Sequence, residues 1–180
     1  MRILPDDTIA LVIDYQEKIL PPIFDKEEFL KRSNILLAGL KELGIPTIVT
    51  AQYTKGLGNT TPEILEALGH DRFHEKFTFS GLGNEEVVEE LAKSGRKNVI
   101  ICGIESHVCV LQTLIDIKEA GYQPILVEDC VSSRKENDKK AAIERAKYEG
   151  AIITTYEAIL FELLQSAKSE HFKAISKLVK

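Results

Sequence analysis

The chain has 180 residues, 44% of them hydrophobic, which is enough for one substantial core and too little for two large ones. We therefore expect a single domain over residues 1–180. The 23 Lys and Arg residues against 28 Asp and Glu residues give a net charge of −5. Because the basic residues are spread along the chain, a nucleic-acid-binding surface is not expected. No apolar run approaches the roughly 18 residues of a membrane span.

Apolar runs alternate with amphipathic patterns from one end of the chain to the other. In chain order we expect a strand at Thr8–Ile13, a helix at Glu27–Leu43, a strand at Pro46–Thr50, a loop at Lys55–Pro62, a helix at Glu63–Leu68, a strand at Phe77–Phe79, a helix at Glu85–Ser94, a strand at Val99–Cys102, a helix at Val108–Ala120, a strand at Pro124–Val127, a helix at Asn137–Glu149, a strand at Ala151–Thr154, a helix at Tyr156–Leu164, and a docked final helix in HFKAISKLVK.

Strands that alternate with long helices require parallel pairing, because each crossover must pack back over the sheet. The predicted fold is a doubly wound (Rossmann-like) three-layer α/β/α domain with a mainly parallel sheet of about six strands. In such sheets ligands bind beyond the carboxyl ends of the strands. Polar residues that end or follow predicted strands are Asp14, Gln52, Tyr53, Cys109 and Asp129. We expect them to face one rim of the sheet.

Cys109 is the most informative of these residues, because it lies where an apolar strand has just ended and a helix begins. Free backbone N–H groups and the positive end of the helix dipole favour a thiolate there, so a depressed pKa and a nucleophilic role are expected. The alternative is a small buried hydrophobe. Cys102, inside the apolar run, is expected to fill the core, and Cys130 to be partly exposed.

The three cysteines also bear on the setting in which the protein works. An odd number gives no disulfide framework, and the start MRILPDDT lacks the pattern of a signal peptide. A reducing, cytoplasmic location is expected. Two weaker signals have structural explanations: His70 and His74 are interpreted as a loop or surface pair, and Gly81 and Gly83 as a turn.

With Asp14, Lys76 and Cys109 considered together, the chain resembles the isochorismatase-like cysteine hydrolases. The resemblance runs nearly end to end and is strongest in GIESHVCV, where Ser106 stands in place of the usual Thr. Further similarity to the branch called isochorismatase domain-containing proteins lies in ILPDDTIALVIDYQEKILPPI, VTAQYTKGLG, VEDCVSSR and GAIITTYEAILFELL. Nothing in the spacing alone distinguishes Lys76 from a surface lysine, so its selection depends on the resemblance.

The resemblance implies a catalytic triad in which Cys109 is the nucleophile, Asp14 the base and Lys76 the third member. It also implies a non-proline cis peptide bond between Ile104 and Glu105, with the backbone N–H groups of Glu105 and Cys109 forming an oxyanion hole. The expected reaction is cofactor-independent hydrolysis of a small amide or related acyl compound through a Cys thioester. The resemblance also implies C–N bond specificity, since true isochorismatases lack this cysteine.

Departures from the family pattern narrow the chemistry. Related nicotinamidases carry an Asp-x-His metal site after the second strand, whereas this chain has AQYT there, so no metal is expected. Gln16, Gln52, Tyr53 and His107 are candidates for the substrate pocket.

Two other functions are consistent with the same residues. One is a catalytically silent oligomeric binding or scaffold protein, and the other is a thiol redox sensor that uses Cys109. The resemblance further implies a homo-oligomer, for which ILPPIF and the C-terminal helix are candidate contact surfaces. Neither a membrane nor a nucleic acid is an expected partner.

Overall fold

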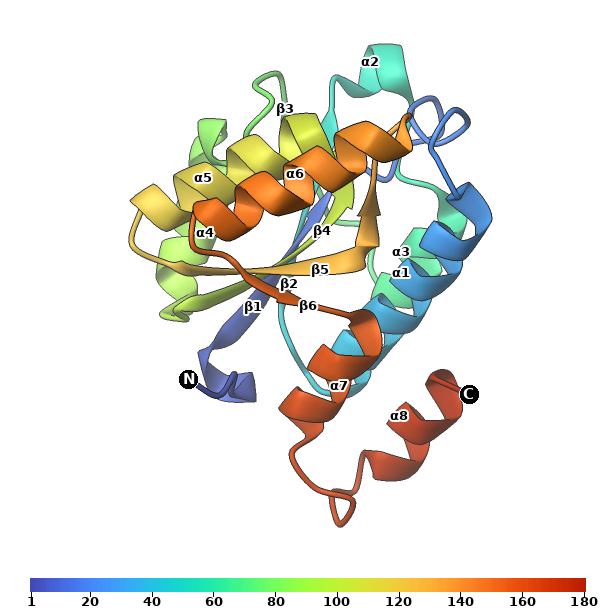
Figure 1. The fold of residues 1–180 in the computed structure, drawn as a ribbon, viewed down its shortest axis with the longest axis vertical. Helices are drawn as coiled ribbons and strands as arrows, with labels where there is room; N and C mark the ends of the chain where they lie inside the picture. Colours follow the sequence, from blue (N-terminus) through green and yellow to red (C-terminus); the bar gives the residue numbers. More distant parts are fainter.

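A computed structural model describes all residues, 1–180. Six parallel strands form one sheet in the order β3-β2-β1-β4-β5-β6, flanked by helices (Figure 1). The strands are β1 (Thr8–Ile13), β2 (Thr47–Gln52), β3 (His74–Lys76), β4 (Asn98–Ile104), β5 (Gln123–Ser132) and β6 (Ile152–Thr154). The helices are α1 (Lys26–Glu42), α2 (Thr54–Leu57), α3 (Pro62–Leu68), α4 (Glu85–Ser94), α5 (Leu111–Glu119), α6 (Glu136–Tyr148), α7 (Tyr156–Leu164) and α8 (Phe172–Leu178). The predicted three-layer α/β/α fold is confirmed.

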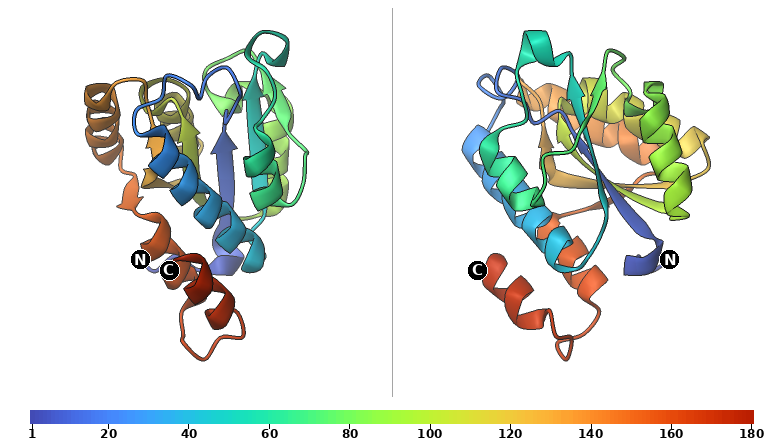
Figure 2. Two further views of the ribbon diagram at one scale, coloured as in Figure 1. Left: turned by 90° about the vertical axis from the view of Figure 1, so that its right-hand side faces the viewer. Right: turned by 180° about the vertical axis from the view of Figure 1, so that it is seen from behind.

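Helices cover both faces of the sheet, because the central strands are apolar on both sides. Every residue of β1 and of β4 is buried. One hydrophobic cluster joins the sheet to α1, α3, α7 and α8, and a second joins its other face to α4, α5 and α6. Figure 1 and Figure 2 show these two groups of helices on opposite sides of the strands. Continuous apolar runs are what a strand buried on both faces requires.

Two elements in the first half of the chain differ from the prediction. The third strand is His74–Lys76, three residues before the predicted Phe77–Phe79, because pairing with β2 runs from Thr50↔His74 to Gln52↔Lys76. The Phe77 side chain is instead 71% exposed. Within the predicted loop Lys55–Pro62, the first residues belong to the short helix α2.

The segment around Cys109 is also more elaborate than a single helix. A π-helical turn, Ser106–Val110, precedes α5, so the predicted helix Val108–Ala120 begins in a wider turn. Such turns are rare and occur often at functional sites. β5 continues five residues beyond the predicted Pro124–Val127, after a register shift against β4.

Candidate active site

Asp14 lies directly after β1 and is fully buried. Its backbone has a φ of 54°, in the left-handed region that few residues other than glycine adopt. The Thr50 hydroxyl, from β2, donates to Oδ1 of Asp14 at 2.8 Å. Backbone strain of this kind commonly persists at functional sites, where the surrounding structure enforces it.

Lys76 ends β3 and is only 2% exposed, which is unusual for a lysine. Its ammonium donates to Oδ2 of Asp14 at 2.7 Å and to Oε1 of Gln52 at 2.6 Å. It also donates to the backbone oxygen atoms of Phe79 at 3.0 Å and of Thr78 at 3.3 Å. The buried cation is therefore neutralised by a carboxylate and surrounded by oxygen atoms, as a charge removed from water requires.

Cys109 completes the cluster from the π-helical turn after β4. Burial, the largest cause, and the nearby Asp14 carboxylate raise the pKa of its thiol to about 12, although the Lys76 ammonium lowers it. The expected depressed pKa is therefore wrong: removal from water outweighs the favourable position at the start of a helix. The resting sulfur is a thiol, with a carboxylate beside it that can accept its proton.

Asp14 and Cys109 meet because β1 and β4 approach each other closely at their ends. Ile13 of β1 is in register with Gly103 of β4, and a Cβ atom on Gly103 would lie 2.1 Å from the Ile13 carbonyl oxygen. Gly103 also has a φ of 127°. Only glycine fits this position.

The peptide bond between Ile104 and Glu105, just before the π-helical turn, is cis. The Glu105 carboxylate accepts a hydrogen bond from Nε of Arg134 at 3.1 Å and forms an ion pair with that side chain. No backbone carbonyl accepts the Glu105 N–H, so this donor is free to bind a ligand atom.

Two threonines that sequence reasoning missed hold the cluster in place. Thr50 orients the Asp14 carboxylate, as described above. Thr113 of α5 donates to the Cys109 carbonyl oxygen at 2.6 Å and accepts from the Gly81 N–H at 2.8 Å. It thereby ties the cysteine helix to the segment that follows Lys76. The position of Thr50 at a predicted strand end was a usable signal, whereas nothing in the sequence marks Thr113.

The four residues predicted to line the substrate pocket have different surroundings. Gln52 contacts Lys76 directly. Gln16 is fully buried and exchanges hydrogen bonds with the Gln52 backbone, so it braces the strand end rather than facing a ligand. Tyr53 is exposed and packs against Phe77 with ring centroids 5.8 Å apart.

The side chain of His107, the fourth candidate, contacts residues outside the cluster of Asp14, Lys76 and Cys109. Its Nδ1 lies 2.9 Å from Oγ of Ser133, and its Nε2 lies 4.0 Å from Oδ2 of Asp138. The sequence interpretation of His107 as a pocket residue receives no support from these contacts.

Asp129 and Cys130 also depart from expectation. Asp129 lies within β5, where its carboxylate accepts from the Tyr156 N–H at 2.9 Å, so it does not join the rim. Cys130 is fully buried rather than partly exposed, because β5 continues through it. Cys102 is buried in the core, as predicted.

The structure holds no group of three or more His, Cys, Asp and Glu side chains with the geometry of a metal site. His70 lies on the connection before β3 and His74 on β3 itself, where they bind Thr47 and two glutamates. No helix is both long and apolar enough to span a membrane.

The fold and this cluster define a doubly wound α/β protein with a buried Asp–Lys pair beside a cysteine. Residues 8–158 match the isochorismatase domain. The chain is 38% identical to the secreted isochorismatase effector Isc1 of Phytophthora sojae (strain P6497), over 99% of this chain and 87% of that protein. It is also 38% identical to isochorismatase domain-containing protein 2 of Danio rerio, over 99% and 89% of the two chains.

Among solved structures, the MAR1 ribonuclease of Caenorhabditis elegans superposes with a TM-score of 0.93 at 39% identity, covering 99% of this chain and 92% of that one. The chain therefore belongs to the isochorismatase family.

Proposed function

We propose that this protein is a cysteine hydrolase that cleaves a small amide or related acyl compound, with Cys109 as nucleophile, Asp14 as general base and Lys76 as the third member. The observation that carries the proposal is the buried ion pair between Asp14 and Lys76, 2.7 Å long, acting on the thiol of Cys109. Hydrophobic side chains could fill this space without the cost of burying two charges. A reactive role accounts for the charges.

The first step forms a bond between Sγ of Cys109 and the carbonyl carbon of the substrate. The thiol proton passes to the Asp14 carboxylate as the bond forms, because the raised pKa keeps the resting sulfur protonated. The carbonyl oxygen becomes an oxyanion, which the N–H groups of Glu105 and Cys109 would stabilise by donating to it. Lys76 keeps Asp14 in place and balances its charge.

Collapse of the tetrahedral intermediate breaks the C–N bond. The proton held by Asp14 moves to the leaving amine, and a thioester remains on Cys109. Water then attacks the thioester, gives one proton to Asp14, and releases the carboxylic acid. The thiol recovers its proton from Asp14, so the enzyme returns to its starting state without a cofactor.

A small substrate suits this site because Cys109 is only 8% exposed. Three exposed aromatic side chains, Tyr53, Phe77 and Phe79, belong to the segments next to Gln52 and Lys76 and offer apolar surface beside the cluster. The proposed substrate is therefore a single small molecule.

Hydrolysis of a library of small amides and acyl compounds tests the proposal. We expect at least one compound to be cleaved by the wild type, and Cys109→Ala to lower kcat/KM by roughly a thousandfold or more. Cys102→Ala is the matched control, since it removes a sulfur atom from the core rather than from the cluster. An RNA oligonucleotide belongs in the panel because the C. elegans relative bears the name ribonuclease.

Equal turnover by wild type and Cys109→Ala on every cleaved compound would refute a nucleophilic Cys109. No turnover of any compound, together with no covalent adduct on Cys109, would favour the binding or scaffold protein. Loss of Cys109 labelling that a reductant does not restore would count against the redox sensor.

A further inference from the structure

The loop of residues 77–84 connects β3 to α4 and supplies part of the oxygen cage around the Lys76 ammonium. The backbone oxygen atoms of Thr78 and Phe79 accept from Nζ of Lys76 at 3.3 Å and 3.0 Å. Within the loop, the Thr78 hydroxyl donates to the Ser80 backbone oxygen at 2.8 Å, which fixes the first of these two ligands. The position of this loop therefore determines where the ammonium can lie.

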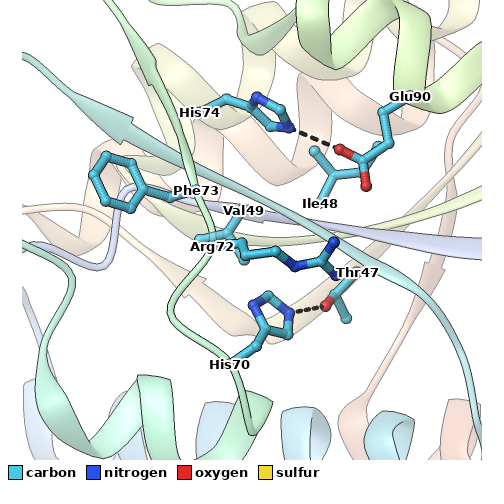
Figure 3. Close-up of a pocket in the computed structure, with 8 residues that line it drawn as sticks. All are labelled: Thr47, Ile48, Val49, His70, Arg72, Phe73, His74 and Glu90. Carbon is cyan, nitrogen blue, oxygen red and sulfur yellow. Dashed lines mark hydrogen bonds and ion pairs between the residues drawn. The ribbon is translucent and has the colours of Figure 1, made fainter.

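Side chains at both ends of the loop close its base. Figure 3 shows the ring of His74, on β3, directed at Glu90 of α4, with Nε2 2.7 Å from the carboxylate. Nδ1 of the same ring lies 3.0 Å from Glu86, also on α4. The Asn84 side chain donates to the Glu75 backbone oxygen at 2.8 Å. Because its two ends are held together, the loop is a closed unit, and the contacts at its tip decide how it sits against the cysteine helix.

Gly81, at the tip of the loop, lies between a threonine of β2 and a threonine of α5. Its N–H donates to Oγ1 of Thr113 at 2.8 Å. A Cβ atom on Gly81 would lie 3.5 Å from Cγ2 of Thr113 and 3.6 Å from Cγ2 of Thr50, which is ordinary contact distance. Both threonines are fully buried. No other hydrogen bond joins the loop to residues 106–120, so Thr113 makes the one directional contact between them.

The Thr113 hydroxyl uses its second hydrogen-bonding role on Cys109. It donates its proton to the Cys109 backbone oxygen at 2.6 Å, while its oxygen accepts from the Gly81 N–H. A threonine that bonds the carbonyl four residues earlier is a common local feature of helices. Acceptance from a separate segment is not, and here that segment carries the oxygen ligands of the ammonium. The hydroxyl therefore joins the turn that holds the sulfur to the loop that holds Lys76.

We propose that Thr113 is a positioning residue, whose hydroxyl fixes the separation between the Cys109 sulfur and the Asp14–Lys76 pair. This inference rests on the proposed function, because Asp14 must lie within hydrogen-bonding reach of the thiol to accept its proton. Without the hydroxyl, the cysteine turn and the loop are free to separate. Proton transfer then slows although every reacting group is still present, since small displacements of reacting groups cost large factors in rate.

Acetylation of Cys109 by p-nitrophenyl acetate, followed by peptide mass spectrometry, tests the proposal. Thr113→Val keeps the shape of the side chain and removes both hydrogen bonds, so we expect the rate of acetylation to fall about tenfold or more. Thr113→Ser keeps the hydroxyl and should recover most of the wild-type rate. Urea unfolding of each variant identifies conditions in which all of them are folded.

Thr8→Val is the matched control. The Thr8 hydroxyl is also fully buried and also donates to the carbonyl oxygen four residues earlier, that of Leu4, at 2.7 Å. Thr8 lies at the opposite end of β1 from Asp14, so its loss should leave the acetylation rate unchanged. Equal rates for wild type and Thr113→Val, no recovery in Thr113→Ser, or an equal loss in Thr8→Val would overturn the positioning role.

Alkylation of Cys109 by iodoacetamide separates this inference from the proposed function, because it needs no acyl transfer. Burial and the Asp14 carboxylate raise the pKa of the thiol, so a sulfur released from both should ionise more readily. We expect Thr113→Val to be alkylated faster than wild type at about pH 8, and Thr8→Val at the wild-type rate. Unchanged alkylation of Thr113→Val would refute the positioning role, whereas absence of acetylation in wild type would refute the proposed function.

Discussion

At the scale of single residues, the Asp14–Lys76 pair explains why this sequence tolerates two charges in its interior. The pair is almost without solvent contact, at 0% and 1% side-chain exposure, and its remaining hydrogen-bonding capacity is met by Thr50, Gln52 and two backbone carbonyls. A buried ion pair whose hydrogen bonds are complete is tolerated in the folded protein. Removal of one partner is strongly destabilising, because it leaves an uncompensated buried charge.

Lys76→Met should therefore destabilise the protein by about 3–5 kcal/mol, since the Asp14 carboxylate would remain buried without its cation. Urea unfolding followed by circular dichroism measures the change. The double variant Asp14→Asn/Lys76→Met should lose less than the sum of the two single variants, because neither charge remains. A loss below about 1 kcal/mol for Lys76→Met, typical of an exposed pair, would contradict the described burial.

The reactivity of Cys109 toward iodoacetamide should rise with pH over a wide range. Because burial raises the pKa of the thiol to about 12, the thiolate fraction should increase about tenfold per pH unit from about pH 7 to about pH 10. Mass spectrometry of the alkylated Cys109 peptide gives the rate at each pH, with Cys109→Ser as control. A plateau at or below about pH 8.5 would show an ordinary or activated thiol instead.

Sequence reasoning found two of the three residues of the cluster from local patterns. Asp14 ends an apolar run, and Cys109 follows another. Lys76 has no such signal, because its burial arises from three-residue pairing of β3 with β2, which short-range periodicity does not reveal. The wrong expectation for the Cys109 pKa has a similar cause: a helix start is visible in a sequence, whereas burial of a side chain by distant segments is not.

At the scale of elements, the contact between β1 and β4 decides how closely Asp14 and Cys109 approach. Gly103 permits this contact, as the 2.1 Å distance from a Cβ atom to the Ile13 carbonyl oxygen shows. The backbone cannot move away without separating two central strands of the sheet.

Gly103→Ala should destabilise the protein by about 3 kcal/mol or more, since the added methyl group overlaps backbone rather than a flexible side chain. Gly95→Ala is the matched control, because Gly95 also has a positive φ, 65°, but has nothing within 4 Å of the added atom. Its cost should be about 1 kcal/mol. Thermal and urea unfolding compare the two variants. Equal losses would show that the strand contact is looser than described.

The elements themselves were predicted well wherever hydrophobic patterns were long. β1, α4 and α7 have the predicted bounds, because their apolar spacing and capping residues agree. β3 was misplaced, because its sequence HEK has no apolar pattern and the neighbouring phenylalanines resemble a strand. The π-helical turn at Ser106–Val110 has no known periodic signal and was missed.

At the scale of the whole molecule, the strand order explains why residues so distant along the chain meet. The sheet winds outward from β1 in one direction through β2 and β3, and from β4 in the other through β5 and β6. Asp14 and Cys109 follow the two central strands, at the point where the order reverses, where ligands bind in such sheets. Lys76 reaches them from β3, the edge strand, across the end of β2.

Two of the aromatic side chains beside the cluster are also candidates for a contact between copies of the chain. Phe77 and Phe79 are 71% and 54% exposed. We expect copies of the chain to cover this surface, in agreement with the homo-oligomer implied by the family resemblance. In the predicted contact segment ILPPIF, Leu20 and Ile23 are buried within the chain, whereas Phe24 is 39% exposed.

Light scattering coupled to size-exclusion chromatography should give a mass that is a multiple of 20.1 kDa, and Phe77→Ser should lower it or weaken the association. Lys97→Ser, an exposed change on the connection before β4, is the control. A single-chain mass for the wild type at all concentrations would contradict the expectation.

Acyl transfer to Cys109 from an activated ester, followed by intact-mass and peptide mass spectrometry, tests whether the thiol, carboxylate and ammonium react as a unit. Wild-type protein given p-nitrophenyl acetate should carry one acetyl group, on the Cys109 peptide, and Asp14→Asn should form this adduct at least about a hundredfold more slowly because no base accepts the thiol proton. Acetylation of Cys109 at the same rate in wild type and Asp14→Asn, or acetylation elsewhere only, would contradict a reactive unit of thiol, carboxylate and ammonium.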